Sequence, residues 1–166
     1  MASTSLTIEQ MLPLLAATPP RLATLTAGLP PARLRAASAQ DAWSANAVLA
    51  HLRACADVWG ACITTMLAED MPTLRAINPR AWIKRTDYLD LDFQPSLAAF
   101  ARQRAELVAI LQPLPRAAWS RAATVTGAGK PLERTVLSYA RRMAGHERPH
   151  VKQIERIVTS LRMERR

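Results

Sequence analysis

Residues 44–69, SANAVLAHLRACADVWGACITTMLAE, decide the fold of this chain. Ser44 is a typical N-terminal helix cap, because its hydroxyl can accept a hydrogen bond from a backbone amide of the first turn. Apolar side chains then recur at the three- and four-residue spacing of a helix with one buried face. This face consists of Val48, His51, Cys55, Val58 or Trp59, Cys62 and Met66. The stretch therefore predicts a buried helix over residues 45–69 with His51 on its inner face.

A helix of the same kind is expected over residues 132–161. Its apolar face consists of Val136, Tyr139 or Ala140, Met143, His146, His150, Ile154, Ile157 and Leu161. Histidines again fall within the apolar stripe instead of opposite it. Pro149 lies inside this helix, removes the hydrogen bond to the Gly145 carbonyl and predicts a local kink.

Two further helices and their connections complete the pattern. One helix is expected to begin after Thr7 and end at Gly28, and another to begin after Ser96 and end before Pro113. Between the second and third helices, residues 70–95 are too long for a tight turn, and they suit a crossover connection with a short helix around residues 81–83.

Residues 124–130 contain two glycines and predict a hairpin or loop. The chain from residues 29–31 onward is expected to form a connection with at most a short turn. Residues 1–166 are therefore predicted to form a single all-α domain, a four-helix bundle.

Composition supports this prediction and excludes several classes of protein. Hydrophobic residues make up 49% of the chain and aromatic residues only 5%, which favours helices with a real core. Two cysteines and a net charge of +9 exclude a disulfide-stapled secreted scaffold and an acidic disordered tail. The first basic residue is Arg21 and no long apolar segment occurs, so we expect a cytoplasmic protein without a membrane partner.

The positive charge is unevenly distributed. Residues 1–100 balance basic against acidic side chains, and residues 101–166 hold the whole net charge of +9. Such a basic region could attract nucleic acid, anionic lipid or an acidic substrate. A solvated helix face decorated with arginines is the commoner explanation, so we do not expect nucleic acid as a partner.

All three histidines of the chain fall on predicted apolar faces. His146 and His150 are four residues apart, so they project from adjacent turns of one helix face and can share a metal ion. His51 comes from another helix, whose buried face can meet theirs in a bundle. Three neutral imidazoles would leave coordination positions open for water and substrate. Alternatively, each histidine is a hydrogen-bonded core residue.

Residues 146–150, HERPH, also match the pattern H-E-x-x-H, in which two histidines bind zinc and the glutamate is a general base. Glu147 is therefore a candidate catalytic residue. It follows His146 by about 100° around the helix, so it could instead contact a metal-ligating residue without facing the metal, or lie at the surface.

Two motifs resemble signatures of the DinB-like superfamily. Residues 43–52, WSANAVLAHL, resemble its W-S-x-x-x-V-x-x-H-L signature, and residues 146–154, HERPHVKQI, resemble its later H-[DE]-x-x-H-x-x-Q-[IL] signature. The likeness covers residues 8–161 in the order and spacing of the helices. It implies a four-helix bundle with up-down-down-up connectivity and a long connection between helices two and three, often assembled as a homodimer.

The resemblance also implies a metal site and a type of reaction. Members carry a divalent metal, usually zinc or nickel, on three histidines, which correspond here to His51, His146 and His150. Characterised members include transferases and isomerases that use bacillithiol, mycothiol or glutathione. The expected function is thus a metal-dependent enzyme that transfers a low-molecular-weight thiol to a small-molecule electrophile.

Other residues could assist such a site. Arg142 and Arg148 could bind a carboxylate of the thiol or substrate, or form exposed salt bridges. Cys55, four residues after His51, could be a metal ligand, a reactive thiol or a core residue.

Three side chains could hold or cover the site. Gln153 could hydrogen-bond a ligand histidine or the backbone, and Trp82 and Tyr88 could form a lid or pin the long connection to the bundle. Besides the thiol-transferring metalloenzyme, two hypotheses stay open. One is a zinc hydrolase built on H-E-x-x-H, and the other is a non-enzymatic helical module that uses its basic region to bind nucleic acid or protein.

Overall fold

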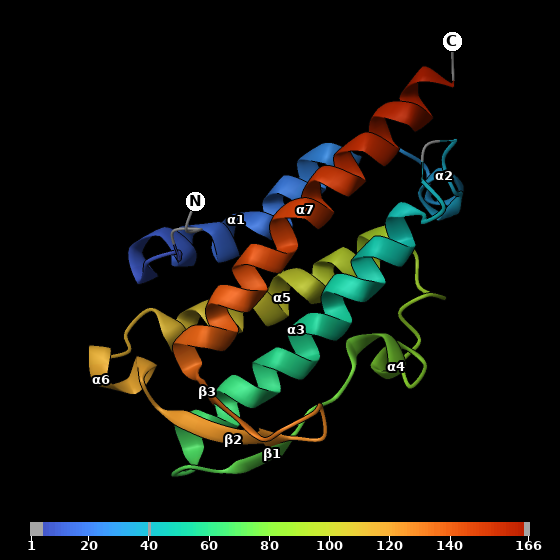
Figure 1. Ribbon diagram of the computed structural model, residues 1–166. Helices are drawn as coiled ribbons and strands as arrows, with labels where there is room; N and C mark the ends of the chain where they lie inside the picture. The colour runs from blue at the N-terminus through green and yellow to red at the C-terminus, as the bar shows by residue number, and fades with distance from the viewer. Residues whose placement is uncertain (1–4, 40, 165–166) are drawn as a thin grey trace.

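A computed structural model describes residues 5–39 and 41–164. Its main elements are long helices, coloured from blue to red in chain order in Figure 1. They are α1 (Ile8–Thr26), α3 (Ala45–Ala68), α5 (Phe93–Leu111) and α7 (Val136–Met163). α3 packs against α7 and α5, and α1 packs against the same two helices. The predicted helical bundle is thus present.

Local side-chain chemistry explains where the helices begin. Thr7 and Ser44 cap α1 and α3 as predicted, each accepting a hydrogen bond from a backbone amide three residues on. The predicted start at Ser96 is wrong, because α5 begins after Asp92 and Ser96 is buried inside it. Pro95 is tolerated there, since an amide in the first helical turn has no intrahelical partner to lose.

A small sheet makes the all-α prediction wrong. β1 (Thr73–Arg75) lies parallel to β2 (Ala122–Thr126), which pairs antiparallel with β3 (Leu132–Thr135). The β2–β3 hairpin falls where a hairpin or loop is predicted, and its turn places Gly127 and Gly129 at positive φ. Because β3 is extended, α7 begins at Val136 and not at residue 132.

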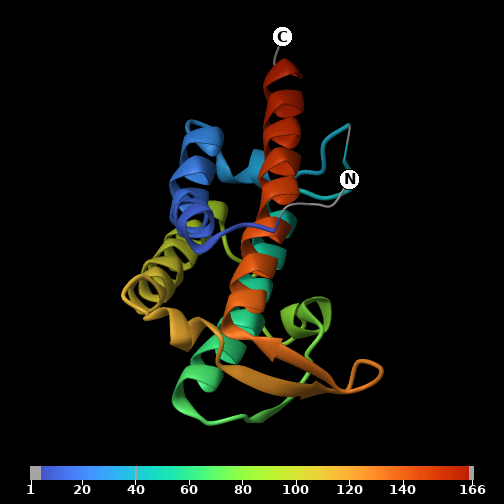
Figure 2. The same ribbon diagram turned by 60° about the vertical axis from the view of Figure 1, so that its left-hand side comes forward.

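Short helices occupy the connections. They are α2 (Pro31–Arg35), α4 (Pro79–Ile83) and α6 (Arg116–Trp119). α4 confirms the short helix predicted in the long connection, and Figure 2 shows it near the hairpin at the α3 side of the molecule. None of the described helices is both long and apolar enough to span a membrane.

A polar layer divides the apolar core. One apolar cluster reaches Ala144 on α7, and the other begins on that helix at Ile154. Between these two positions lie His146, Glu147 and His150. Burying polar side chains costs free energy unless they are partnered, so this layer is where functional chemistry is expected.

Candidate metal centre

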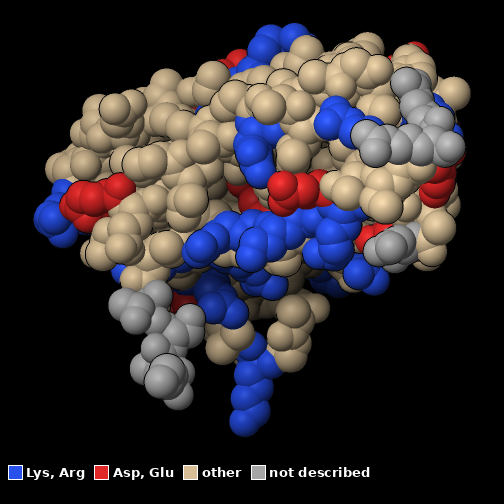
Figure 3. All heavy atoms as spheres, turned by 90° about the horizontal axis from the view of Figure 1, so that it is seen from above, with Lys and Arg blue, Asp and Glu red and all other residues tan. Residues whose placement is uncertain are grey.

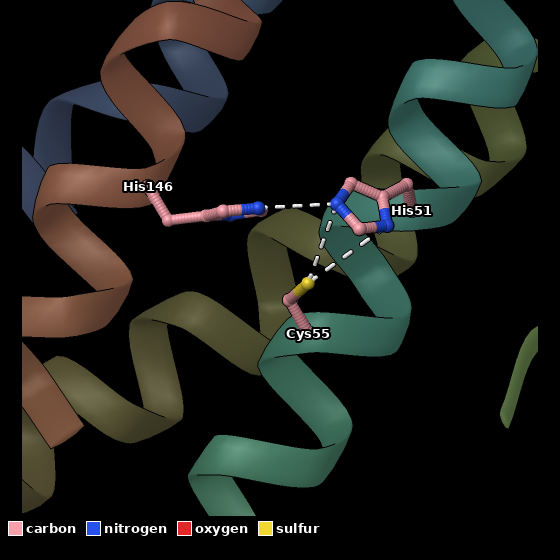
Figure 4. A group of neighbouring side chains, drawn as sticks. All are labelled: His51, Cys55 and His146. Atoms are coloured by element: carbon pink, nitrogen blue, oxygen red, sulfur yellow. Dashed lines mark hydrogen bonds between the residues drawn. The ribbon is translucent and has the colours of Figure 1, made fainter. Parts of the chain in front are cut away.

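The three histidines meet between α3 and α7. His51 Nε2 lies 3.1 Å from His146 Nε2, and His150 Nε2 lies 3.2 Å from the same His146 atom. Figure 4 shows His51 and His146 pointing toward one another from the two helices. Tetrahedral zinc with bonds of about 2.0–2.1 Å to nitrogen would hold its ligand atoms about 3.3 Å apart. The observed spacing therefore suits a shared divalent ion.

Gln153, which is itself hydrogen-bonded to Asp41, orients the His150 ring. Gln153 Nε2 donates a hydrogen bond to Asp41 Oδ2 at 3.0 Å, and Gln153 Oε1 lies 2.8 Å from His150 Nδ1. Because an amide oxygen can only accept, Nδ1 of His150 carries the proton and its Nε2 keeps the lone pair that faces the cluster. Metal-ligating histidines typically have such support. The predicted hydrogen bond between Gln153 and a histidine is thus present, whereas Asp41 was not anticipated because it belongs to no motif.

Replacing Gln153 with alanine should lower the affinity for zinc about 10- to 100-fold, because His150 loses the acceptor that holds its ring in place. Competition with a chromophoric chelator would measure the affinity. Lys152→Ala is the matched control, since the exposed Lys152 side chain neighbours Gln153 in the chain and should change affinity less than about twofold. An unchanged affinity in Gln153→Ala would contradict the orienting role.

Burial keeps two of the imidazoles neutral. Removal from water is the main cause that lowers the pKa of both His51 and His146 to about 4. Neutral imidazole is the form that binds metal. His146 Nδ1 is buried without a hydrogen-bond partner among the described residues. The support that Gln153 gives to His150 therefore has no counterpart at His146 within the described residues.

Metal-free protein should lose stability as the pH falls from about 6.5 to about 4. In the unfolded chain these histidines have the ordinary pKa of 6.5, so they bind protons that the folded chain accepts only near pH 4. Each histidine then reduces the free energy of unfolding by about 1.4 kcal/mol per pH unit in this window. Urea unfolding of chelator-treated protein at about pH 7 and about pH 5 would measure the loss.

The matched control for this pH dependence is the double variant His51→Gln/His146→Gln, which reports what all other groups contribute. It should lose less stability between the two pH values than the wild type. Equal losses in the two proteins would show that the histidines are not held neutral by burial.

Cys55 adds a fourth donor atom to the cluster. Its Sγ lies 3.7 Å from His51 Nε2, and one ligand atom from each of His51, Cys55 and His146 lies within 4.8 Å of the others (Figure 4). Burial, and then the charge of Glu147, raises the pKa of the thiol to about 12. A coordinated cation would reverse this effect, because a ligating thiol is deprotonated. Cys55 thus has both the burial of a core residue and the position of a ligand.

Glu147 belongs to a buried ion pair. Its carboxylate accepts hydrogen bonds from the Arg104 guanidinium and, at 2.8 Å, from Thr18 Oγ1. Arg104 is 2% exposed and Glu147 is 3% exposed, so the predicted surface position of Glu147 is wrong. Among the described residues, neither carboxylate oxygen bonds to a histidine. The H-E-x-x-H hypothesis needs this carboxylate free to take a proton, and the geometry does not support it.

Figure 1 shows α7 as one unbroken helix, and Pro149 lies inside its bounds. Pro149 and Gly145, whose carbonyl loses its helical partner, are both exposed, so water can satisfy that carbonyl. The predicted kink therefore does not separate His146 from His150, and their Nε2 atoms lie 3.2 Å apart.

Asp57 fastens the long connection to α3. Its carboxylate accepts hydrogen bonds from Trp82 Nε1 at 3.0 Å, Tyr88 Oη at 2.6 Å and Gln103 Nε2 at 2.6 Å. Of the two roles predicted for Trp82 and Tyr88, pinning the connection is the one that these contacts support. Asp57 itself carries no sequence signal, because its partners lie 25 to 46 residues away.

Arg142 and Arg148 form no ion pair with a carboxylate in the part of the chain that the structure describes. The alternative that these two arginines form salt bridges is therefore wrong within the described residues. The Arg142 guanidinium lies 5.1 Å from the centre of the Trp59 ring, and that ring is perpendicular to the His146 ring, with centroids 5.0 Å apart. Trp59, predicted only as a core residue, thus connects Arg142 with the histidine cluster.

The family of the chain follows from its sequence. A sequence profile of the DinB superfamily matches residues 14–154, which include all three clustered histidines. The chain belongs to the DinB superfamily. Among solved structures, this DinB-superfamily chain is similar to YfiT from Bacillus subtilis, described as "a probable metal-dependent hydrolase with an unusual four-helix bundle topology". The TM-score is 0.79 at 20% identity, over 99% of this chain and 93% of YfiT. No curated protein sequence matches the chain significantly.

Proposed function

We propose that this protein is a divalent-metal-dependent enzyme in which His51, His146 and His150 hold zinc or nickel. The observation that carries the proposal is the position of His146 Nε2, which lies 3.1 Å from His51 Nε2 and 3.2 Å from His150 Nε2. Histidine nitrogen suits both metals, and three protein ligands leave a position for a reacting group. Cys55 would add a sulfur ligand when that position is empty.

A metal bound there would lower the pKa of a water or thiol and supply a nucleophile at neutral pH. The protein itself prepares the site. Gln153 orients His150, and the Trp43 and Trp59 rings pack perpendicular to the rings of His51 and His146 at centroid distances of 5.7 and 5.0 Å. These rings exclude water and so keep both histidines neutral.

The reaction that we propose is transfer of a low-molecular-weight thiol to a small electrophile, as the family resemblance suggests. A carbon–sulfur bond forms, the bond to the leaving group breaks, and the thiol proton passes to the solvent. Hydrolysis is the second candidate, because YfiT is described as a metal-dependent hydrolase. In that case water provides the nucleophilic oxygen.

An activity screen would separate the two reactions. Zinc- and nickel-loaded protein would be assayed with monochlorobimane plus glutathione or cysteine, and with p-nitrophenyl acetate without thiol. We expect conjugation above the uncatalysed rate that is lost in His51→Ala. Ester hydrolysis without thiol would instead support the second candidate, and loaded protein that accelerates neither reaction would count against the enzyme proposal.

The proposal includes three broader expectations. The helices follow the up-down-down-up order, the protein acts in the cytoplasm, and two chains assemble as a homodimer. Analytical ultracentrifugation of the purified protein would test the dimer, with a single species of about the monomer mass of 18.3 kDa counting against it.

A further inference from the structure

Two neighbouring cavities carry basic side chains without acidic ones. The first has a volume of about 660 Å³ and the second about 590 Å³. They share Arg134, Tyr139 and Arg142, and the first adds Arg141 and Arg148. No aspartate or glutamate is among the described residues that line either cavity. Lys and Arg also gather in a band across the face seen in Figure 3.

The second cavity, here called the hairpin cleft, lies between α3, α7, the segment before α4 and the β2–β3 hairpin. Its apolar lining includes Val58, Trp59, Ile77, Val125 and Leu132. Ile77 and Leu132 are each 48% exposed, so the mouth of the cleft presents apolar side chains to solvent. An apolar cleft with a few converging polar groups is typical of a small-molecule site.

The arginines of this cleft are free to bind an anion. Neither Arg134 nor Arg142 forms an ion pair with a carboxylate within the described ranges. Arg142 lies over the Trp59 ring, which packs perpendicular to the His146 ring with centroids 5.0 Å apart. An anion on these guanidinium groups would therefore sit one aromatic ring away from the histidine cluster.

We propose that the hairpin cleft binds a small organic anion, with its carboxylate or phosphate on Arg134 and Arg142 and its apolar body against Trp59. Guanidinium groups bind both kinds of anion through charge-assisted hydrogen bonds. That this anion is the substrate of the histidine site rests on the proposed function, whereas its binding does not require a metal.

Titrations of metal-free protein would test this binding site. The probes are naphthalene-2-carboxylate, 2-naphthyl phosphate and the neutral naphthalene-2-carboxamide. Binding would be followed by the NMR signal of the Trp59 indole N–H, assigned by its loss in Trp59→Phe. The two anions should bind at least about tenfold more tightly than the amide, and the stronger of them identifies the anionic group.

Substitutions localise the effect. Arg134→Gln and Arg142→Gln should each weaken anion binding about tenfold and leave amide binding unchanged. Arg156→Gln removes the same charge from an exposed position further along α7 and should change the affinity less than about twofold. Equal affinity for the amide, an equal loss in Arg156→Gln, or no response at Trp59 would each overturn the proposal. Because no metal is present, none of these outcomes depends on whether the protein is an enzyme.

Discussion

His51→Ala protein should contain less than about one tenth of the metal that the wild type binds, which should approach one ion per chain. His51 is the ligand contributed by α3, and its Nε2 lies 3.1 Å from that of His146. Without it, the cluster keeps the two imidazoles of α7 and the Cys55 thiol, and burial raises the pKa of that thiol to about 12, which opposes the thiolate form that binds metal. Mass spectrometry of tag-free protein after dialysis would measure the metal content, and circular dichroism would confirm that the variant is folded.

Two further variants define the ligand set. His150→Ala should lose metal as His51→Ala does, because its Nε2 approaches the same His146 atom at 3.2 Å. Cys55→Ser keeps the size of the side chain and should retain the metal if the histidines suffice. Unchanged metal content in His51→Ala would disprove the shared site, and metal loss in Cys55→Ser would make the thiolate a required ligand.

Glu147→Leu should reduce the free energy of unfolding by about 3–5 kcal/mol, since it leaves the buried Arg104 guanidinium without its counter-charge. Arg104 is 2% exposed, and its guanidinium also donates a hydrogen bond to the Leu15 carbonyl at 3.0 Å, so it cannot turn to solvent without disrupting the α1–α5 contact. Urea unfolding of the metal-free proteins would measure the difference.

The double variant Arg104→Met/Glu147→Leu is the control. It removes both charges and should be more stable than either single variant, because no unpaired charge remains in the core. Thr18 keeps its other hydrogen bond, to the Leu14 carbonyl at 3.1 Å. A double variant as unstable as the sum of the single losses would show that the charges are not coupled. Glu147→Gln protein should still bind metal, because in the wild type the Glu147 carboxylate accepts hydrogen bonds from Arg104 and Thr18.

Local sequence was sufficient to predict the long helices and the approximate position of the histidine site. The stripe from Val48 to Met66 and the stripe from Val136 to Leu161 follow the helical period, which depends only on residues three and four apart. Histidines on these stripes had to face inward. The family motifs then paired His51 with His146 and His150, which the structure brings together.

Only the tertiary structure determined which distant side chains pair. β1 has three residues and gains its partner from β2, just over fifty positions later, so nothing local distinguishes it from a loop. Arg104 and Glu147 meet because α5 packs within the same bundle as α7, and Asp41 reaches Gln153 across more than a hundred residues. Such contacts depend on how helices pack and in which register, and side-chain periodicity within one helix carries no information about the register of its neighbour. The sequence by itself therefore determined the helices and their inward-facing histidines, whereas helix packing determined the ion pair, the support of His150 and the arginine-lined cleft.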